Sequence, residues 1–262
     1  MFEKKTIING EKIECDKKED IEISVCMACY NGEKYILEQL QSILIQLNDN
    51  SELIIIDDGS QDSTLDIINS FNDQRIKVYS NSKNVGVNKT FEKAITYSKG
   101  KYIFLADQDD IWTTKHLPSM LMAMKNVNGS MLVSGNIVAI NEEGNLINYD
   151  FGKLLEKDEK AYKKNIIKIF QGRAYYYGCA MAFSREMKNY ILPFPEYMES
   201  HDLWIAMIAN VINKNRHIND NVLYRRIHES NVSIIQRNLK EKIISRIIFM
   251  RLLFEAKRRI KK

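Results

Sequence analysis

One short segment of this chain has three carboxylates within four positions, and these are the clearest candidates for binding or catalysis. Asp107, Asp109 and Asp110 directly follow the apolar run 102–105. Ligands of open α/β sheets bind at the carboxyl ends of strands, so this cluster predicts a cationic partner. On a continuing strand, Asp107 and Asp109 would point the same way and could share a divalent ion and a hydroxylated ligand. The alternative is a helix cap, which needs only one carboxylate.

Four apolar runs in the first half of the chain each end in a polar cluster, and helical spacing of apolar residues separates the runs. Strands that alternate with helices of this length predict an α/β fold with a mostly parallel central sheet flanked by helices. The clusters would then lie along one edge and line one crevice. The expected strands are 21–28, 53–56, 76–79 and 102–105, and the clusters are Tyr30-Asn31, Asp57-Asp58, 81–84 and 107–110.

This alternation weakens beyond residue 112. Helices are expected near 115–125, 157–170 and 201–212, and strands at 131–134 and 137–140, with a hairpin turn at 141–145. The segment 175–183 begins with three tyrosines beside Gly178. Two interpretations of it stay open, namely a core strand and a wall on which a sugar ring stacks.

Two late residues are further candidates. Asp202 opens the helix expected at 201–212, where it is either a helix-start carboxylate or, near a cleft, a general base. His228 is a lone histidine in the polar segment 224–233. Neither residue decides a function without the others.

The composition is that of a globular protein with one main domain. The chain has 262 residues, of which 45% are hydrophobic and 27% charged. Residues 1–20 form a charged N-terminal extension without the apolar centre of a signal peptide, and no apolar window is long enough to span a membrane. A cytoplasmic location is therefore expected.

The basic charge is concentrated in the tail. Residues 237–262 hold ten Lys or Arg against two Glu, so the rest of the chain is mildly acidic, which argues against nucleic acid as a partner. Apolar residues recur at helical spacing over 239–260, which predicts a basic amphipathic helix within a C-terminal unit at 236–262. An anionic membrane surface is the favoured partner of this helix. The alternatives are packing on the domain and pairing with a second subunit in a homodimer.

The cysteines do not form a metal framework. Cys26 and Cys29 have C-x-x-C spacing, but no second pair completes a zinc site. We interpret them as buried thiols.

Taken together, these segments resemble an inverting family 2 glycosyltransferase with the GT-A fold, over roughly residues 21–235. Within the family, the combination of Asp-Gln-Asp-Asp-Ile-Trp with His-Asp-x-Trp resembles bacterial enzymes of the rhamnosyltransferase type. The matching segments are 27–31, 57–60, 84–86, 106–110, 178–181, His201-Asp202 and His228.

The resemblance implies a role for each matching residue. Ala28 and Tyr30 would flank the nucleotide base, Asp58 would hydrogen-bond the base, and Asp107 would hold the ribose or the donor sugar. Asp109 would bind Mg²⁺ or Mn²⁺ at the diphosphate, and His228 would complete the metal site. Asp202 would be the general base. The remaining expected site residues are Asn84 and Gly86 in the nucleotide-sugar loop, and Gly178, His201 and Trp204 in the donor and acceptor sugar region.

The implied reaction moves a single sugar, rhamnose or another hexose, from a dTDP- or UDP-sugar to a glycan or lipid-linked glycan during bacterial surface polysaccharide synthesis. Two departures from the family are visible. His201 stands where Glu is frequent, and the Gln-x-x-Arg-Trp element of processive members is missing. A non-catalytic scaffold that binds nucleotide or glycan is the alternative. A nucleotidyltransferase would need a glycine-rich basic loop after the first strand, and none follows it.

Overall fold

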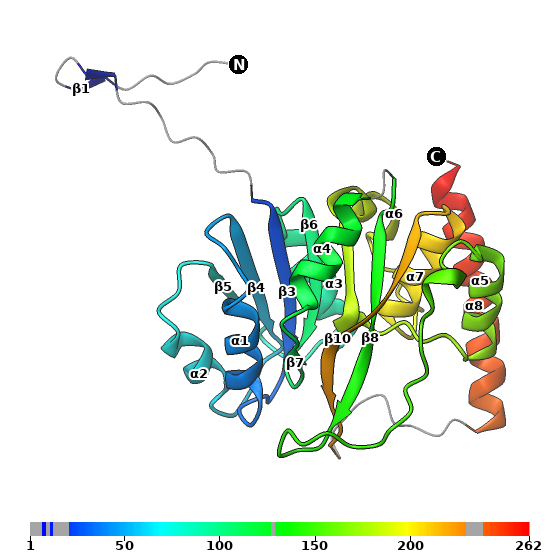
Figure 1. Ribbon diagram of the computed structural model, residues 1–262, viewed down its shortest axis with the longest axis horizontal. Coiled ribbons are helices and arrows are strands. Elements are labelled where there is room, and N and C mark those ends of the chain that lie inside the picture. Colours follow the sequence, from blue (N-terminus) through cyan, green and yellow to red (C-terminus); the bar gives the residue numbers. More distant parts are fainter. Residues whose placement is uncertain (1–6, 9–10, 13–20, 127–128, 229–237, 262) are drawn as a thin grey trace.

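A single large sheet organises the part of the chain that this computed structural model describes, namely residues 7–8, 11–12, 21–126, 129–228 and 238–261. Eight strands in those ranges form this sheet (Figure 1). In spatial order they are β5 (Ile76–Ser80), β4 (Ser51–Asp57), β3 (Ile23–Cys29), β6 (Tyr102–Asp107), β9 (Met181–Ser184), β8 (Leu132–Ile140), β10 (Asn215–Arg226) and β7 (Ile111–Trp112). A separate small pair consists of β1 (Ile7–Ile8) and β2 (Glu11–Lys12).

The sheet is mixed, with parallel pairing in the majority. Strands β5, β4, β3 and β6 pair parallel to one another, as do β8 and β10. Strand β9 runs antiparallel to both of its neighbours, and β7 runs antiparallel to β10. The expected mostly parallel α/β sheet flanked by helices is confirmed.

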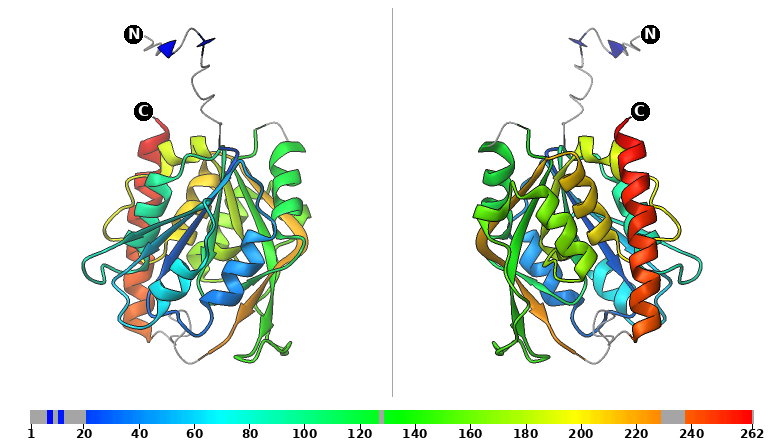
Figure 2. Two further views of the ribbon diagram at one scale, coloured as in Figure 1. Left: turned by 90° about the vertical axis from the view of Figure 1, so that its left-hand side faces the viewer. Right: turned by 90° about the vertical axis from the view of Figure 1, so that its right-hand side faces the viewer.

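Helices cover both faces of the sheet, because most side chains of its central strands are apolar. All seven residues of β4 are buried, as expected for a parallel strand that is covered on both sides. Figure 2 views the sheet from its ends and shows α1 and α4 on one side and α8 on the other. The helices are α1 (Ile36–Leu44), α2 (Thr64–Ser70), α3 (Val87–Tyr97), α4 (His116–Asn126), α5 (Tyr162–Gln171), α6 (Lys188–Ile191), α7 (His201–Val211) and α8 (Leu239–Ile260).

Two apolar layers result from this arrangement. Leu40 of α1 and Met120 of α4 are buried in the layer on one face. Phe91 of α3, Ile205 of α7 and Phe249 of α8 belong to the layer on the other face. Because β3, β4, β5, β6, β8 and β10 all run in one direction, their carboxyl ends share one edge, which is the lower edge in Figure 1.

The second half departs from the sequence-based expectation in three places. The helix expected near 157–170 begins only at Tyr162, after a 3₁₀ turn at Glu156–Asp158. The two short strands expected at 131–134 and 137–140 are one strand, β8. It continues through Gly135 because the glycine lies against Val222 of β10, where a Cβ atom would come within 2.7 Å of the valine side chain. Asn136 does not break the strand either, because its amide is bonded to Leu154 and Ile218. The expected turn at 141–145 is present and is closed by a bridge between Ile140 and Leu146.

The tyrosine segment is mostly not a strand. Only Met181–Ser184 pairs as β9, after a short 3₁₀ turn at Gly178–Ala180. Tyr176 is buried, and its hydroxyl lies 2.8 Å from Nε2 of His217, so it belongs to the core. Tyr177 donates its hydroxyl to the carbonyl of Phe151 at 2.9 Å. The structure thus favours the core interpretation of these residues over an open sugar-stacking wall.

The expected C-terminal helix is confirmed as α8. It begins with a capping box in which Asn238 accepts from the Glu241 amide and the Glu241 carboxylate accepts from the Asn238 amide. Phe249, Leu252 and Ala256 are buried against the domain. The α8 helix is therefore packed along one side of the domain.

Helix α1 allows a direct test of the apolar layer. Replacing Leu40, which is fully buried, with Ala should lower the free energy of unfolding by about 2–5 kcal/mol, because a cavity is left beneath the helix. Leu37 lies on the same helix with 45% of its surface exposed, and its replacement with Ala should change stability by less than about 0.5 kcal/mol. Urea unfolding at 25 °C measures both changes, and equal losses would contradict this packing.

Candidate active site

The loops after β3 and β6 are fastened together by one side chain. The Tyr30 amide donates to Oε1 of Gln108 at 2.8 Å, and Nε2 of Gln108 donates to the Tyr30 carbonyl at 3.0 Å. Gly32 leaves room for this amide, because a Cβ there would come within 2.3 Å of Oε1 of Gln108. Ala28 pairs in register with Asp107 across β3 and β6. Ala28, Tyr30 and Asp107, which sequence reasoning placed in one site, are therefore neighbours.

Asp58 organises the loop that follows β5. Its buried carboxylate accepts hydrogen bonds from Nδ2 of Asn81 at 2.8 Å and from the amides of Val85 and Gly86, both at 2.9 Å. Gly86 has a φ of 89°, a backbone conformation that favours glycine. Asn84 is exposed, and its Oδ1 accepts from the Gly86 amide at 3.0 Å. Asp58, Asn84 and Gly86 thus lie close together, as expected, and the Asp58 carboxylate holds the loop that contains Asn84 and Gly86 through its hydrogen bonds.

The carboxylates after β6 lie in a buried cluster with a thiol. Asp107, Asp110 and Cys179 each offer a ligand atom within 4.8 Å of the others. Oδ1 of Asp110 accepts from the Arg226 amide at 3.1 Å, whereas its buried Oδ2 has no hydrogen-bond partner within the described ranges. Burial and the neighbouring Asp109 raise the pKa of Asp107 to about 6, and the same two causes raise the pKa of Asp110 well above its usual value. The cluster therefore favours the arrival of positive charge.

Asp109 and His228 meet at the rim of this cluster. Nε2 of His228 lies 2.8 Å from Oδ2 of Asp109, although 119 residues separate them in sequence. The His228 ring also packs against Tyr35, with ring centroids 5.1 Å apart. The two residues assigned to the metal from the sequence are thus brought together. Asp110 belongs to the carboxylate cluster expected from the sequence, whereas Cys179 joins it as a residue to which sequence reasoning gave no role in metal binding.

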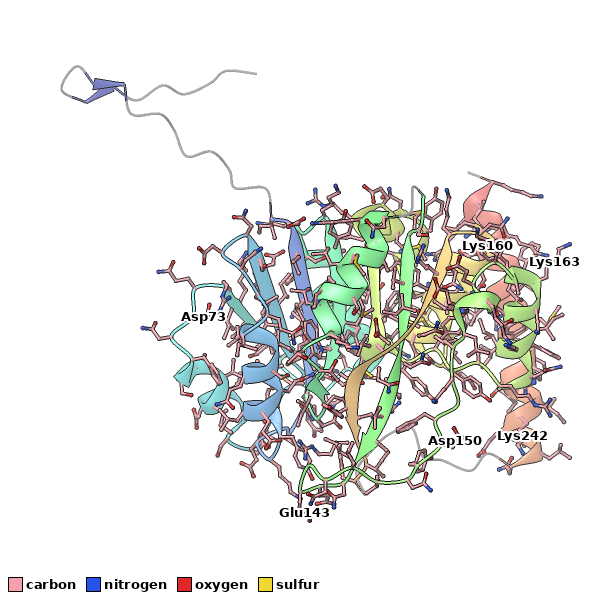
Figure 3. The ribbon with its side chains drawn as sticks, viewed as in Figure 1. Asp73, Glu143, Asp150, Lys160, Lys163 and Lys242 are labelled. Carbon is pink, nitrogen blue, oxygen red and sulfur yellow. The ribbon has the colours of Figure 1, made fainter. Side chains whose placement is uncertain are left out.

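Arg225 and Arg226 are adjacent at the end of β10, and their side chains lie on opposite sides of the strand. The fully buried Arg226 donates to the carbonyls of Asp109 at 3.1 Å and Glu142 at 2.7 Å, and it pairs with the Glu38 carboxylate. Arg226 therefore clamps the acidic loop to α1 and to the turn after β8. Figure 3 shows Glu143, the next residue of that turn, at the carboxyl edge of the sheet.

Arg225 lies within reach of the acidic cluster. Its guanidinium stacks over the rings of Tyr177 and Phe151, at 5.1 and 5.6 Å from their centroids. Burial works to lower the pKa of Arg225, but the neighbouring Cys179, Asp110 and Asp107 raise it overall, so the group stays charged. Sequence reasoning missed both arginines. The alternation of side chains along a strand that leads to His228 was the signal that could have identified them.

Asp202 stands in the first turn of α7, beside the acidic cluster. Ser200 caps the helix and also contacts the Asp202 carboxylate, whose Oδ1 accepts from the Leu203 amide at 2.7 Å. Burial raises the pKa of Asp202 above its usual value. A Cβ on Gly178 would lie 3.5 Å from Cβ of Asp202, and the next residue, Cys179, lies within 4.8 Å of Asp107 and Asp110, so the residue assigned as base from the sequence lies close to the acidic cluster.

The other residues expected in the sugar region have different surroundings. Gly178 lies against His201, and a Cβ on Gly178 would come within 2.8 Å of Nε2 of His201. Trp204 is fully buried, and its indole donates to the Ile191 carbonyl at 3.0 Å. The structure therefore does not place Trp204 in the crevice, because the first turn of α7 directs this side chain into the apolar layer behind it.

A cavity of about 290 Å³ lies next to the loop that Asp58 holds. It separates the start of α3 from the segment that leads to α7, and its lining comprises residues 85–89 together with Phe194, Pro195, Glu196 and Met198. Asn88 lines this cavity and also accepts a hydrogen bond from the His201 amide at 3.1 Å. The Asp58 loop and the start of α7 are therefore connected through α3.

Comparison with known proteins decides the family. The family model described as glycosyl transferase family 2 matches residues 24–191, which is more than half of the chain. The chain belongs to glycosyl transferase family 2.

Two relatives of this family 2 chain show how far the similarity extends. The Escherichia coli protein WfgD, named as a UDP-Glc:α-D-GlcNAc-diphosphoundecaprenol β-1,3-glucosyltransferase, is 28% identical over 85% of this chain and 83% of its own length. An uncharacterized glycosyltransferase of Methanocaldococcus jannaschii is 32% identical over 72% of this chain and 65% of its own length.

Solved structures confirm the GT-A fold of this family 2 chain. Staphylococcus aureus TarS 1–349 in complex with UDP-GlcNAc superposes with a TM-score of 0.65 at 20% identity, over 91% of this chain and 72% of that one. The mannosyltransferase PcManGT of Pyrobaculum calidifontis, in complex with GDP-Man and Mn²⁺, superposes with a TM-score of 0.58 at 14% identity, over 92% of this chain and 74% of that one. The nucleotides and the metal belong to those two proteins.

Several other predictions from the sequence can be compared with the structure. Cys26 and Cys29 are buried free thiols on β3, in agreement with the interpretation given to them. Most of the N-terminal extension 1–20 and the end of the expected domain at 229–235 lie outside the described residues. No helix within the described ranges is long and apolar enough to cross a membrane.

The raised pKa of Asp107 leads to a prediction about pH and stability. Above its ordinary pKa of 3.8 the unfolded carboxyl loses its proton, whereas the folded one keeps it until about pH 6. The ionised group therefore lowers the stability of the metal-free protein as pH rises through this window. At pH 7, Asp107→Asn should raise the free energy of unfolding by about 2 kcal/mol, and the gain should vanish near pH 4.

Urea unfolding with a chelator present measures this effect. Glu143→Gln, which alters an exposed carboxylate on a surface turn, is the matched control and should leave stability nearly unchanged at both pH values. A destabilised Asp107→Asn protein at pH 7 would show that the carboxylate cluster is not under electrostatic strain.

Proposed function

We propose that this protein is an inverting, divalent-metal-dependent glycosyltransferase that moves one sugar from a nucleoside diphosphate donor to a glycan or lipid-linked acceptor. The observation that carries the proposal is the meeting of the acidic cluster with the start of α7 at residues 178–179. Cys179 lies within 4.8 Å of Asp107 and Asp110, and a Cβ on the preceding Gly178 would come within 3.5 Å of Cβ of Asp202. Negative charge and a candidate base thus lie close together at the carboxyl edge of the sheet. Family membership supports the reaction class.

The acidic cluster fits a divalent cation, Mg²⁺ or Mn²⁺. Asp107, Asp109 and Asp110 supply carboxylate oxygens, which such ions prefer, and His228 adds an imidazole nitrogen at the rim. The Asp110 oxygen without a partner is the clearest sign, because a buried carboxylate oxygen is costly to leave unpaired. Cys179 fits less well, since burial raises the pKa of its thiol well above the usual value and keeps it protonated. When bound, the cation would neutralise charge on the leaving diphosphate.

Asp202 is the proposed base. A carboxylate at the start of α7 can accept the proton of an acceptor hydroxyl as that oxygen attacks the anomeric carbon. Attack from the face opposite the diphosphate inverts the anomeric centre. The raised pKa of Asp202 suits this role, because a more basic carboxylate takes the proton more readily.

The loops fastened by Gln108 and Asp58 are the proposed nucleotide site. Ala28, Tyr30 and Asp58 would surround the base, and the segment from Asn84 to Gly86 would follow the nucleotide. UDP and dTDP are the proposed carriers of a hexose or rhamnose. WfgD, whose name specifies UDP-Glc and a lipid-linked diphosphate acceptor, supports a place in bacterial surface polysaccharide synthesis. Since the chain lacks a Gln-x-x-Arg-Trp element, we propose transfer of one sugar per encounter.

A screen for ligands and turnover tests this proposal against the non-catalytic scaffold. UDP- and dTDP-sugars are added with and without Mn²⁺, and the melting temperature and the release of nucleoside diphosphate are both measured. A ligand that binds only the folded form raises the melting temperature. Binding with turnover supports the transferase, binding without turnover for any acceptor supports the scaffold, and the absence of binding refutes both.

The base assignment leads to a mutational prediction. Asp202→Asn should lower kcat by about a thousandfold or more while the Kd of the donor changes less than about threefold, because the substitution removes the base and leaves the acidic cluster intact. Asp109→Ala should instead weaken the binding of donor and Mn²⁺ together. Steady-state kinetics and calorimetric titration separate the two effects, and native turnover by Asp202→Asn would exclude this residue as the base.

We further propose that α8 binds an anionic membrane on the cytoplasmic side. Its apolar stripe consists of Leu239, Ile243, Ile247, Met250 and Phe254, whose exposed fractions are 54–76%. Steps of four, four, three and four residues place them on one face of the helix. This face lies opposite the buried Ser245, Phe249, Leu252 and Ala256.

Basic residues border the apolar stripe on both sides, which is the arrangement of an interfacial helix on anionic lipid. They are Lys240, Arg251 and Arg258 on one side and Lys242, Arg246 and Lys257 on the other. In Figure 3, Lys242 lies in the same lower half as Glu143, so the first turns of α8 are nearest the carboxyl edge. A lipid-linked acceptor would then reach the crevice from the membrane plane.

The apolar stripe can be tested without unfolding the helix. The double variant Ile247→Ser and Phe254→Ser should reduce partitioning onto phosphatidylglycerol vesicles about tenfold or more, with no change in melting temperature. Ile167→Ser, at an equally exposed position on α5, should not reduce it. Co-sedimentation measures binding, and sedimentation velocity measures mass. A dimer that this double variant dissociates, with no vesicle binding by the native chain, would replace the membrane with a second subunit.

A further inference from the structure

The imidazole of His201 has one satisfied nitrogen and one unsatisfied nitrogen. The ring is buried at the start of α7 and stacks on Phe91, with centroids 4.3 Å apart. Its Nδ1 lies 3.2 Å from Oδ1 of Asn88. Its Nε2 is buried and has no hydrogen-bond partner within the described ranges. Which nitrogen carries the proton therefore decides what this ring offers to a ligand.

The contacts of Asn88 show which nitrogen of the His201 ring carries the proton. The backbone amide of His201 can only donate, and it lies 3.1 Å from Oδ1 of Asn88. The Glu199 carbonyl can only accept, and it lies 3.3 Å from Nδ2 of Asn88. Both contacts assign the same orientation to the Asn88 amide, so its oxygen faces the His201 ring. Nδ1 must then carry a proton, and Nε2 of the neutral ring is left with a bare lone pair. Burial lowers the pKa of His201 to about 4, which keeps the ring neutral.

The bare lone pair belongs to the active site. Gly178 faces it, because a Cβ built on that glycine would lie 2.8 Å from Nε2 and 3.5 Å from Cβ of Asp202. The Asp107 carboxylate is close enough to act on the charge of the ring. Nε2 is thus a buried, unsatisfied hydrogen-bond acceptor at the contact between Gly178 and the start of α7, next to the proposed base. A hydroxyl group is the complementary donor in a sugar.

We propose that Asn88 holds His201 as a hydrogen-bond acceptor and that Nε2 of His201 recognises one hydroxyl group of the transferred sugar. This inference rests on the proposed function. Asn88 is the positioning residue, because only an amide can accept from the His201 amide and Nδ1 while it donates to the Glu199 carbonyl. His201 becomes a specificity-determining residue, since a sugar without that hydroxyl leaves the lone pair unpaired.

The tautomer can be measured on the native protein without any substrate. Nitrogen-15 NMR of the imidazoles at pH 7 should show His201 protonated at Nδ1 only, with its signals assigned by their loss in His201→Phe. Asn88→Leu, which has a similar shape but no amide, should abolish this preference, and Asn88→Asp should retain the proton on Nδ1. A native ring protonated at Nε2, singly or in addition to Nδ1, would refute the inference.

The sugar contact is tested with the donor that supports turnover and its monodeoxy analogues. In the native enzyme, one analogue should lose about tenfold in kcat/KM beyond the others, as expected for one hydrogen bond. His201→Phe keeps the ring stacked on Phe91 but removes the acceptor, so its kcat/KM for the full sugar should fall by a similar factor with no further loss for that analogue. His201→Gln, whose amide oxygen can accept, should restore part of the discrimination.

The outcomes separate this inference from the function beneath it. If the native chain turns over a sugar and His201→Phe still discriminates against every analogue as the native enzyme does, the sugar contact is wrong and the transferase proposal stands. If the native chain neither binds nor transfers any UDP- or dTDP-sugar, both fail. The melting temperature of each variant shows whether a loss reflects misfolding, and the NMR result on the native protein does not depend on the variants.

Discussion

Negative charge buried at one edge of the sheet is the constraint on which the rest of this structure depends. Asp110 is buried and Asp107 and Asp109 are partly buried close to it, and like charges repel more strongly there than in bulk water. A protein keeps such a cluster only if positive charge compensates it. Arg225 supplies a fixed part of that charge at the cluster. The unpartnered oxygen of Asp110 indicates that compensation within the described residues is incomplete.

Hydrogen bonds from side chains to backbone groups hold the loops at this edge of the sheet in position. Gln108 fastens the loop after β3, Asp58 shapes the segment that ends at Gly86, and Arg226 clamps the carbonyl of Asp109. Each of these contacts pairs a side chain with a backbone group, which has a fixed direction. A shift in one loop is therefore transmitted to its neighbour. This arrangement accounts for an acidic cluster that stays ordered despite its repulsion.

His201 is where the chain departs from the Glu that is frequent in its family, and its surroundings fit the change. A carboxylate beside Asp107 would add negative charge to the cluster, whereas the neutral imidazole adds none. Phe91 provides an apolar surface for the ring, and Asn88 provides an acceptor for its Nδ1. A different side chain at this position thus brings different partners from α3.

The amino-acid sequence was enough to predict the α/β alternation, the order of the first strands and the carboxylates after β6. Apolar periodicity is a local property, and the direction of parallel strands then forces residues such as Asp58 and Asp107 to one edge. The resemblance to family 2 added Asp202 and His228 in advance of any coordinates. The α8 helix was also predictable with its bounds, because its apolar residues repeat without interruption over 239–260.

Which of these residues contact one another becomes visible only in the folded structure. Contacts that hold the site together join residues far apart in sequence. Asp109 and His228 are 119 residues apart, Asn88 and His201 are 113 apart, and Arg226 is 117 residues from Asp109 and 84 from Glu142. No local pattern records such contacts. Trp204, which the resemblance assigns to the sugar region, is fully buried, because the rotation of the helix turns its side chain into the apolar layer. Spacing along the chain fixes the face of an element, but packing decides what that face meets.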